Sequence, residues 1–127
     1  MSNRVQWIAH KGKTILSCDY SNQSEDEYIQ ALAETETEVL KQAPGTLILM
    51  LIDTTGSLIT TKVTGRAREL AAAARKKGIP SSPTAVVGVS GAAQKAILLA
   101  MQFLRPDLRA VDSIAEAKDW LVSRAEK

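Results

Sequence analysis

The chain has 127 residues, 45% of them hydrophobic and 24% charged, with a net charge of +2; this suits one globular domain and points to no particular partner. A single cysteine excludes an internal disulfide, and one cysteine with one histidine cannot supply the ligands of a structural zinc site. No apolar run approaches the roughly 18 residues of a membrane span, and the N-terminal residues lack the apolar core of a signal peptide, so we expect a cytoplasmic protein.

The first part of the chain predicts a hairpin, a helix and a buried strand. Val5–His10 and Lys13–Asp19 are strand-like and are separated by a tight turn, which predicts an antiparallel pair. Ser24 and Glu27 have the spacing of a capping box, so a helix should begin there. The apolar face of this helix contains Ile29, Leu32, Val39 and Ala43. Residues 46–52 follow a Pro-Gly stop and are apolar on both sides, which predicts a central parallel strand buried on both faces.

The middle of the chain predicts a helix followed by a second buried strand. The helix begins at Thr61 or Thr64, has an alanine-rich centre that favours helix, and ends at Lys77 before Gly78. The apolar run 84–89 is then typical of a strand buried on both faces.

The last part predicts a helix, a short edge strand and a final helix. Ser90 and Gly91 open a helix that runs to about Leu104 and is apolar almost all round. Such a helix is either largely buried or presents one face to a partner. Residues 109–111 follow as an edge strand, and 113–116 form a second capping box for the final helix. One face of the final helix contains Ile114, Ala117, Leu121 and Ala125.

The resulting order is β-β-α-β-α-β-α-β-α in one domain, residues 1–127. A hairpin followed by alternating strands and helices implies an α/β fold with a mixed, mostly parallel sheet flanked by helices.

Several segments carry a resemblance to a known family. They are KGKTIL at 11–16, DYSN at 19–22, LMLID at 49–53, TAVVGVSG at 84–91, and 113–122, which ends in AKDWL. With the element order, they resemble the STAS domain of sulfate transporters and anti-sigma-factor antagonists, and in particular the small bacterial STAS-like proteins grouped with the CRAL-TRIO lipid carriers. The resemblance covers nearly the whole chain and implies a regulatory role. Lipid transport is not expected, because the chain lacks the extra helices that wall a long acyl cavity.

The resemblance also directs attention to hydroxyl groups. STAS regulators carry a phosphorylatable serine in an Asp-Ser-Ser-Gly motif at the start of the helix after the central strand. Residues 53–56 (Asp-Thr-Thr-Gly) look similar but directly abut the strand, whereas the regulators place their motif further along, where this chain has Thr60 and Thr61 and no serine pair. The candidate phospho-acceptors are Ser57, Thr60 and Thr61. A phosphate would be stable at a helix N-terminus, but one threonine can equally be a helix cap and the others loop residues.

A small-ligand or anion site is the alternative to a protein-binding role. Ligands of open α/β sheets bind beyond the carboxyl ends of the strands, and exposed N–H groups at helix N-termini bind anions. The turns after the two buried strands should both lie at that edge and border a crevice. The candidate residues are Asp53, Thr54, Thr55, Gly56, Ser90 and Gly91.

Gly88-Val89-Ser90-Gly91-Ala92 resembles the nucleophile elbow of hydrolases, but its last position is alanine. The only histidine, His10, precedes the serine, whereas those hydrolases place it last. We therefore expect Ser90 to cap the helix and Gly91 to permit close packing, with no catalytic residue, metal or cofactor. Cys18 lies within a strand and should be a buried, inert thiol.

Charge is segregated along the chain. Residues 14–40 contain seven acids and no lysine or arginine, and residues 62–77 contain six basic residues and one acid. Two solvated helix faces, a complementary protein partner, or pairing between copies of the chain in a homodimer would each account for this. Nucleic acid is not favoured, since the basic segment has no interleaved aromatics and the domain as a whole is not strongly basic. Our leading expectation is a non-enzymatic module that binds a protein partner under the control of hydroxyl phosphorylation.

Overall fold

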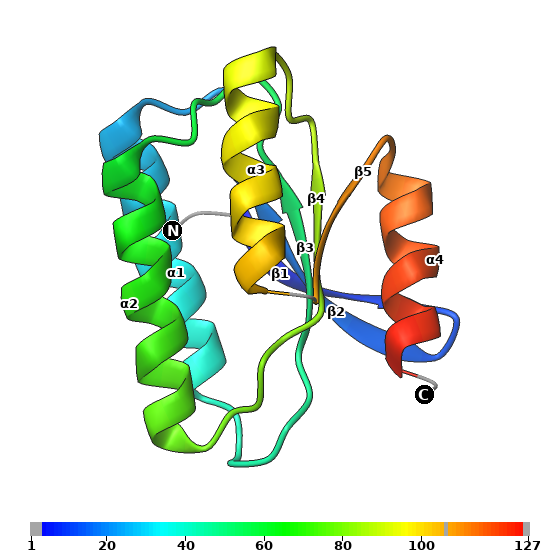
Figure 1. Ribbon diagram of the computed structural model, residues 1–127. Coiled ribbons are helices and arrows are strands. Elements are labelled where there is room, and N and C mark those ends of the chain that lie inside the picture. Colours follow the sequence, from blue (N-terminus) through cyan, green and yellow to red (C-terminus); the bar gives the residue numbers. More distant parts are fainter. Residues whose placement is uncertain (1–3, 106, 126–127) are drawn as a thin grey trace.

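The computed structural model describes residues 4–105 and 107–125 and has an α/β architecture, with a five-stranded mixed sheet and four helices in that part of the chain (Figure 1). In chain order the elements are β1 (Val5–His10), β2 (Lys13–Asp19), α1 (Glu25–Leu40), β3 (Leu49–Asp53), α2 (Thr61–Lys77), β4 (Thr84–Val87), α3 (Ala92–Leu104), β5 (Leu108–Val111) and α4 (Ile114–Ala125). No helix among the described residues combines the length and apolarity needed to cross a membrane.

The strands lie in the sheet in sequence order, β1-β2-β3-β4-β5, with β1 antiparallel to β2 and the remaining pairs parallel. Each parallel crossover therefore steps in the same direction. Because such crossovers are almost always right-handed, they place their helices on the same face of the sheet. Figure 1 shows α1, α2 and α3 on one side and α4, which follows the last strand, on the other.

Local signals explain where the helices begin. Ser24 caps α1 in a complete capping box: its hydroxyl accepts from the Glu27 N–H at 3.2 Å, and the Glu27 carboxylate accepts from the Ser24 N–H at 2.9 Å. The second predicted box is only half formed. Ser113 accepts from the Glu116 N–H at 3.1 Å, but the Glu116 carboxylate accepts from the N–H of Asp112, one residue earlier than predicted.

Element ends differ from the predictions where the chain leaves the sheet. Helix α1 ends at Leu40, so Ala43 lies outside it and is exposed. Strand β3 begins at Leu49 rather than at 46, because the preceding loop crosses the end of α2, where the Gly45 N–H donates to the Gly78 carbonyl at 2.8 Å. Strand β4 ends at 87 rather than 89, since the ladder closes there and the chain turns away.

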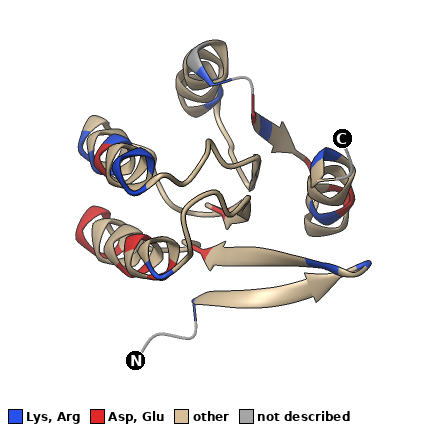
Figure 2. Ribbon diagram, turned by 90° about the horizontal axis from the view of Figure 1, so that it is seen from below, with Lys and Arg blue, Asp and Glu red and all other residues tan. Residues whose placement is uncertain are grey.

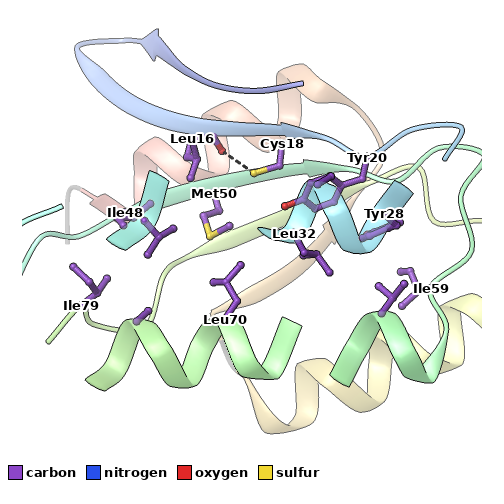
Figure 3. Packing of buried hydrophobic residues seen from close by; sticks show 14 residues of the cluster. Leu16, Cys18, Tyr20, Tyr28, Leu32, Ile48, Met50, Ile59, Leu70 and Ile79 are labelled. Carbon is purple, nitrogen blue, oxygen red and sulfur yellow. Dashed lines mark hydrogen bonds between the residues drawn. The ribbon is translucent and has the colours of Figure 1, made fainter. Parts of the chain in front are cut away.

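The two faces of the sheet bury alternate residues. Leu16, Cys18 and Met50 point toward α1 and α2, and Figure 3 shows them packed with side chains from both helices. On the opposite face, a second cluster packs against α4 and contains Ile15, Leu49, Leu51, Ala85, Val87, Val111, Ala117 and Leu121. The expected burial of Cys18 is confirmed, as its side chain is 1% exposed.

Candidate functional site

The two turns singled out in the sequence lie side by side at the carboxyl edge of the sheet. The Thr54 N–H donates to the Val87 carbonyl at 2.9 Å, extending the β3–β4 ladder into the first turn. A Cβ on Gly88, whose φ is +86°, would lie 2.1 Å from Thr55 Oγ1 and 2.6 Å from the Thr55 nitrogen. Only glycine fits this contact. The turns therefore pack directly on each other where the sequence predicted a crevice between them.

The polar groups of these turns are only partly paired: Asp53 and Thr55 bond to each other, whereas the buried Thr54 hydroxyl has no hydrogen-bond partner among the described residues. Asp53 Oδ1 accepts from the Thr55 N–H at 3.0 Å and from its hydroxyl at 2.6 Å, which fixes the turn that Gly56 completes. Ser90 is exposed and does not cap α3; the cap position is Gly91, which makes no side-chain bond.

Gly91 was also expected to permit close packing, and this is wrong: nothing lies within 4 Å of the position a Cβ would take. Its φ of +84° is the conformational reason for a glycine at this point.

The three candidate phospho-acceptors occupy different environments. The Ser57 hydroxyl donates to the Tyr20 carbonyl at 2.6 Å and accepts from the Gln23 N–H at 2.8 Å, so it ties two loops together. Thr60 caps α2 by accepting from a backbone N–H at 3.2 Å, and it donates to the Glu25 carboxylate at 2.5 Å. Thr61 is exposed, and its hydroxyl makes no hydrogen bond among the described residues. Of the three, Thr61 is the hydroxyl that a modifying enzyme could reach without breaking a contact.

The residues compared with a hydrolase do not converge. His10 pairs with Lys13 at the start of β2, the amino edge of the parallel strands, and its ring lies 2.9 Å from the Asp119 carboxylate. The hydrogen bond from His10, and then that from Lys11, lower the pKa of Asp119 below its ordinary value. Ser90 lies beyond the carboxyl end of β4, at the opposite edge of the sheet. His10 is therefore not placed to act as a base for Ser90.

The segregated charges meet within one chain. Helices α1 and α2 pack side by side, and the colouring of the ribbon in Figure 2 shows acidic positions along α1 next to basic positions along α2. Arg66 makes a half-buried ion pair with Glu36 at 2.8 Å, Lys62 approaches Asp26 at 3.9 Å, and the ammonium of Lys77 donates to a carbonyl at the end of α1. The acidic and basic segments, which the sequence suggested for partner binding, are thus partly paired with each other between these two helices.

The sequence left two alternatives for α3, a largely buried helix or a helix with one face presented to a partner. The structure shows that α3 is not largely buried. Leu98 is 3% exposed and packs on β4 and β5, but Leu99 is 65% and Phe103 89% exposed. Further exposed residues on the helix are Ala92, Ala93, Lys95, Ala96 and Ala100. The physical reason is position: α3 is the last helix in the row of three, and α4 lies on the other face of the sheet.

A cavity of about 240 Å³ lies on the same face of the sheet, between α1, α2 and the strands β3 and β4, and Arg105, just after α3, completes its lining. A second, of about 70 Å³, adjoins it and shares six of its lining residues: Tyr20, Leu32, Ile52, Ala67, Thr84 and Arg105. Figure 3 shows Met50, Leu32 and Leu70 pointing into this part of the core from β3, α1 and α2. Neither cavity is lined by residues 53–57 or 88–91, so both lie away from the edge where the sequence placed a ligand.

Sequence reasoning missed two arginines. Arg75 and Arg105 line the larger cavity, one near the end of α2 and the other just after α3. In the sequence both lie close to residues that typically end a helix, Gly78 after Arg75 and Pro106 after Arg105, so neither indicated a binding site. That both line one cavity depends on the order of the strands, which places α2 and α3 on the same face of the sheet.

No family model, curated protein or solved structure matches the chain.

Proposed function

We propose that this chain is a non-enzymatic, STAS-like regulatory module of the bacterial cytoplasm, and that it binds a partner protein through the outer face of α3. The observation that carries the proposal is the joint exposure of Leu99 and Phe103. The two side chains are one helical turn apart and so form one surface. Single exposed hydrophobic residues are normal, whereas contiguous apolar surface is typical of interaction sites.

The charges around this face define the partner. Helix α3 contains no acidic residue, and its one charged residue, Lys95, is exposed. Arg68 is exposed on α2, one turn from Thr64, which lines the smaller cavity between α2 and α3. Contact between two α3 helices across a two-fold axis would place cations on both sides of the interface, with no acid on α3 to pair with them. We therefore assign the face to a different protein, one that offers an amphipathic helix whose apolar stripe is flanked by acids.

Phosphorylation control belongs to the same proposal, with Thr61 as the acceptor. A phosphate at the first position of α2 would lie at the positive end of the helix, next to Lys62. The loop before this helix is tied to α3, since the Gln94 side-chain oxygen accepts from the Ile59 N–H at 2.6 Å. A charge added at Thr61 would therefore act near the amino end of the proposed docking helix.

Photo-crosslinking tests the docking face. A benzoylphenylalanine at position 103 is expected to attach to an apolar segment of one partner, with aspartate or glutamate on its flanks, as mapped by mass spectrometry. The same probe at Leu47, which is 47% exposed in the loop before β3, is the matched control and should not attach there. Attachment to a second copy of the chain, to a segment without acids, or equally from both positions would overturn the proposal.

Affinity for the mapped segment supplies the second measurement. Phe103→Ala should weaken binding about 30-fold, because burying a phenylalanine contributes ~2 kcal/mol. Leu47→Ala should leave it unchanged. Added salt should also weaken binding, since exposed charge pairs are screened.

A further inference from the structure

The larger cavity is a space with an apolar interior and a polar mouth. Its apolar wall comes from α1, α2, β3 and the chain after α2, and includes Leu32, Val39, Met50, Leu70, Ala74 and Ile79. The mouth lies beside Arg75, Pro80 and Ser81, which are exposed. An apolar cavity of about 150 Å³ is enough to hold benzene, so about 240 Å³ suits a group of roughly ten non-hydrogen atoms.

Two arginines, Arg75 and Arg105, line this cavity. Arg105 is half-buried and makes only long contacts, 3.4 Å to the Ser82 carbonyl and 3.5 Å to the Thr84 hydroxyl. Arg75 makes no hydrogen bond or ion pair among the described residues. The nearby carboxylate of Asp107 is bonded to Arg124 at 2.5 Å.

The electrostatics of Arg105 agree with this geometry. Burial is the main cause that lowers the pKa of Arg105; the charge of Arg75 acts in the same direction and that of Asp107 opposes it. Two cations, one of them half-buried, thus line one cavity, and neither makes an ion pair with a carboxylate in the part of the chain that the structure describes. Such a pair favours an anion between them, since guanidinium groups bind carboxylates in a two-pronged geometry.

We propose that this cavity binds a small amphipathic carboxylate, with its apolar body between α2 and the sheet and its carboxylate held by Arg75 and Arg105 at the mouth. The site is separate from the outer face of α3 and from the carboxyl-edge turns. Either this site or the partner-binding face can therefore fail without the other.

Straight-chain carboxylic acids added to the full chain test the size of the cavity and its preference for a negatively charged ligand. Binding is measured by calorimetry. Each methylene buried should strengthen binding about fourfold, so octanoate should bind roughly 15-fold more tightly than hexanoate. The gain should stop near decanoate, when the cavity is full. Octanol should bind at least tenfold more weakly than octanoate, and octylamine should not bind, because both lack the negative charge.

Matched variants test the residues. Arg75→Gln and Arg105→Gln should each weaken the binding of octanoate about tenfold and leave the binding of octanol unchanged. Lys76 is an exposed cation beside Arg75, and Lys76→Gln should change the binding of neither ligand. Ala71 lines the cavity and Ala72 faces solvent on the same helix. Ala71→Leu should therefore abolish binding of both ligands, and Ala72→Leu should not.

Methyl NMR of the unmodified chain gives a readout that does not depend on any variant folding. Octanoate should shift the methyl signals of Met50, Leu70 and Ile79, and leave those of Leu121 on the other face of the sheet unmoved. Equal affinity for octanoate and octanol, shifts confined to other methyl groups, or no binding of octanoate at millimolar concentration would each overturn the proposal.

Discussion

Two neighbouring leucines of α3 test how this helix is oriented, which decides what it can present to a partner. Leu98 is 3% exposed and packs with Val86 and Leu108, whereas Leu99 is 65% exposed. Both residues are leucines in the same helix, so Leu98→Ala and Leu99→Ala remove the same atoms and change helix propensity equally. The two variants differ only in the packing that surrounds the removed atoms. We expect Leu98→Ala to destabilise the fold strongly and Leu99→Ala to have almost no effect.

The magnitude follows from the packing of Leu98. Removing three buried carbons costs ~2.4 kcal/mol in transfer free energy. A void of ~50 Å³ that does not collapse adds ~1.2 kcal/mol. We expect little collapse, because Leu98 already borders the smaller cavity and its neighbours are not tightly packed on that side. The total is ~3.6 kcal/mol, or a fall in Tm of ~13 °C for a chain of this length. Leu99→Ala should remain within ~0.5 kcal/mol.

Urea unfolding followed by circular dichroism at 222 nm and by tryptophan fluorescence measures both variants against the unmodified protein. Coincident transitions by the two probes support a two-state reading of the free energies. Similar costs for Leu98→Ala and Leu99→Ala, or a larger cost for Leu99→Ala, would show that α3 is not oriented as described, and the proposed docking face would fall with it.

Three further outcomes are expected. Gly88→Ala should cost ~3 kcal/mol or more because a Cβ there meets backbone, whereas Gly91→Ala, with a similar φ and open space, should cost ~1 kcal/mol in urea unfolding; equal costs would contradict the packed turns. Burial raises the pKa of Tyr28 to about 12 and that of Tyr20 well above its ordinary value, so stability is full below pH 10 and is lost as pH rises through the folded-state values. Absorbance at 295 nm should then show tyrosinate only as the protein unfolds, and a normal titration near pH 10 in the native state would refute this burial. Burial also raises the pKa of Cys18 to about 11, so a thiol reagent should modify it only after denaturation; rapid reaction with the native protein would count against its inertness.

Short-range signals made the class of fold predictable. The pair Ser24 and Glu27 fixes the start of α1 because its bonds join groups only three residues apart. The runs that became β3 and β4 are apolar on both sides because helices cover both faces of the sheet. The α/β class with a mixed sheet flanked by helices was therefore predictable, and the errors in the elements lay at their ends, in half of the second capping box and in the cap expected at Ser90.

The candidate sites were less predictable, because they depend on residues far apart in the chain. Ser90 follows a strand and precedes a helix in the sequence, yet it caps nothing, since the backbone at Gly91 turns with a positive φ. Apolar residues all round α3 gave no means of knowing which side would remain uncovered.

By itself, then, the sequence determined which segments are helix or strand, since caps, turns and hydrophobic period act over a few residues. Only the tertiary structure decided what those elements bring together. Sequential strand order sets α1 beside α2, so that Arg66 neutralises Glu36 within the chain. The same order brings Arg75 and Arg105 to one cavity and leaves the outer face of α3 bare. Ion pairing and burial depend on how close residues from distant parts of the chain lie in space, and no local sequence pattern encodes that.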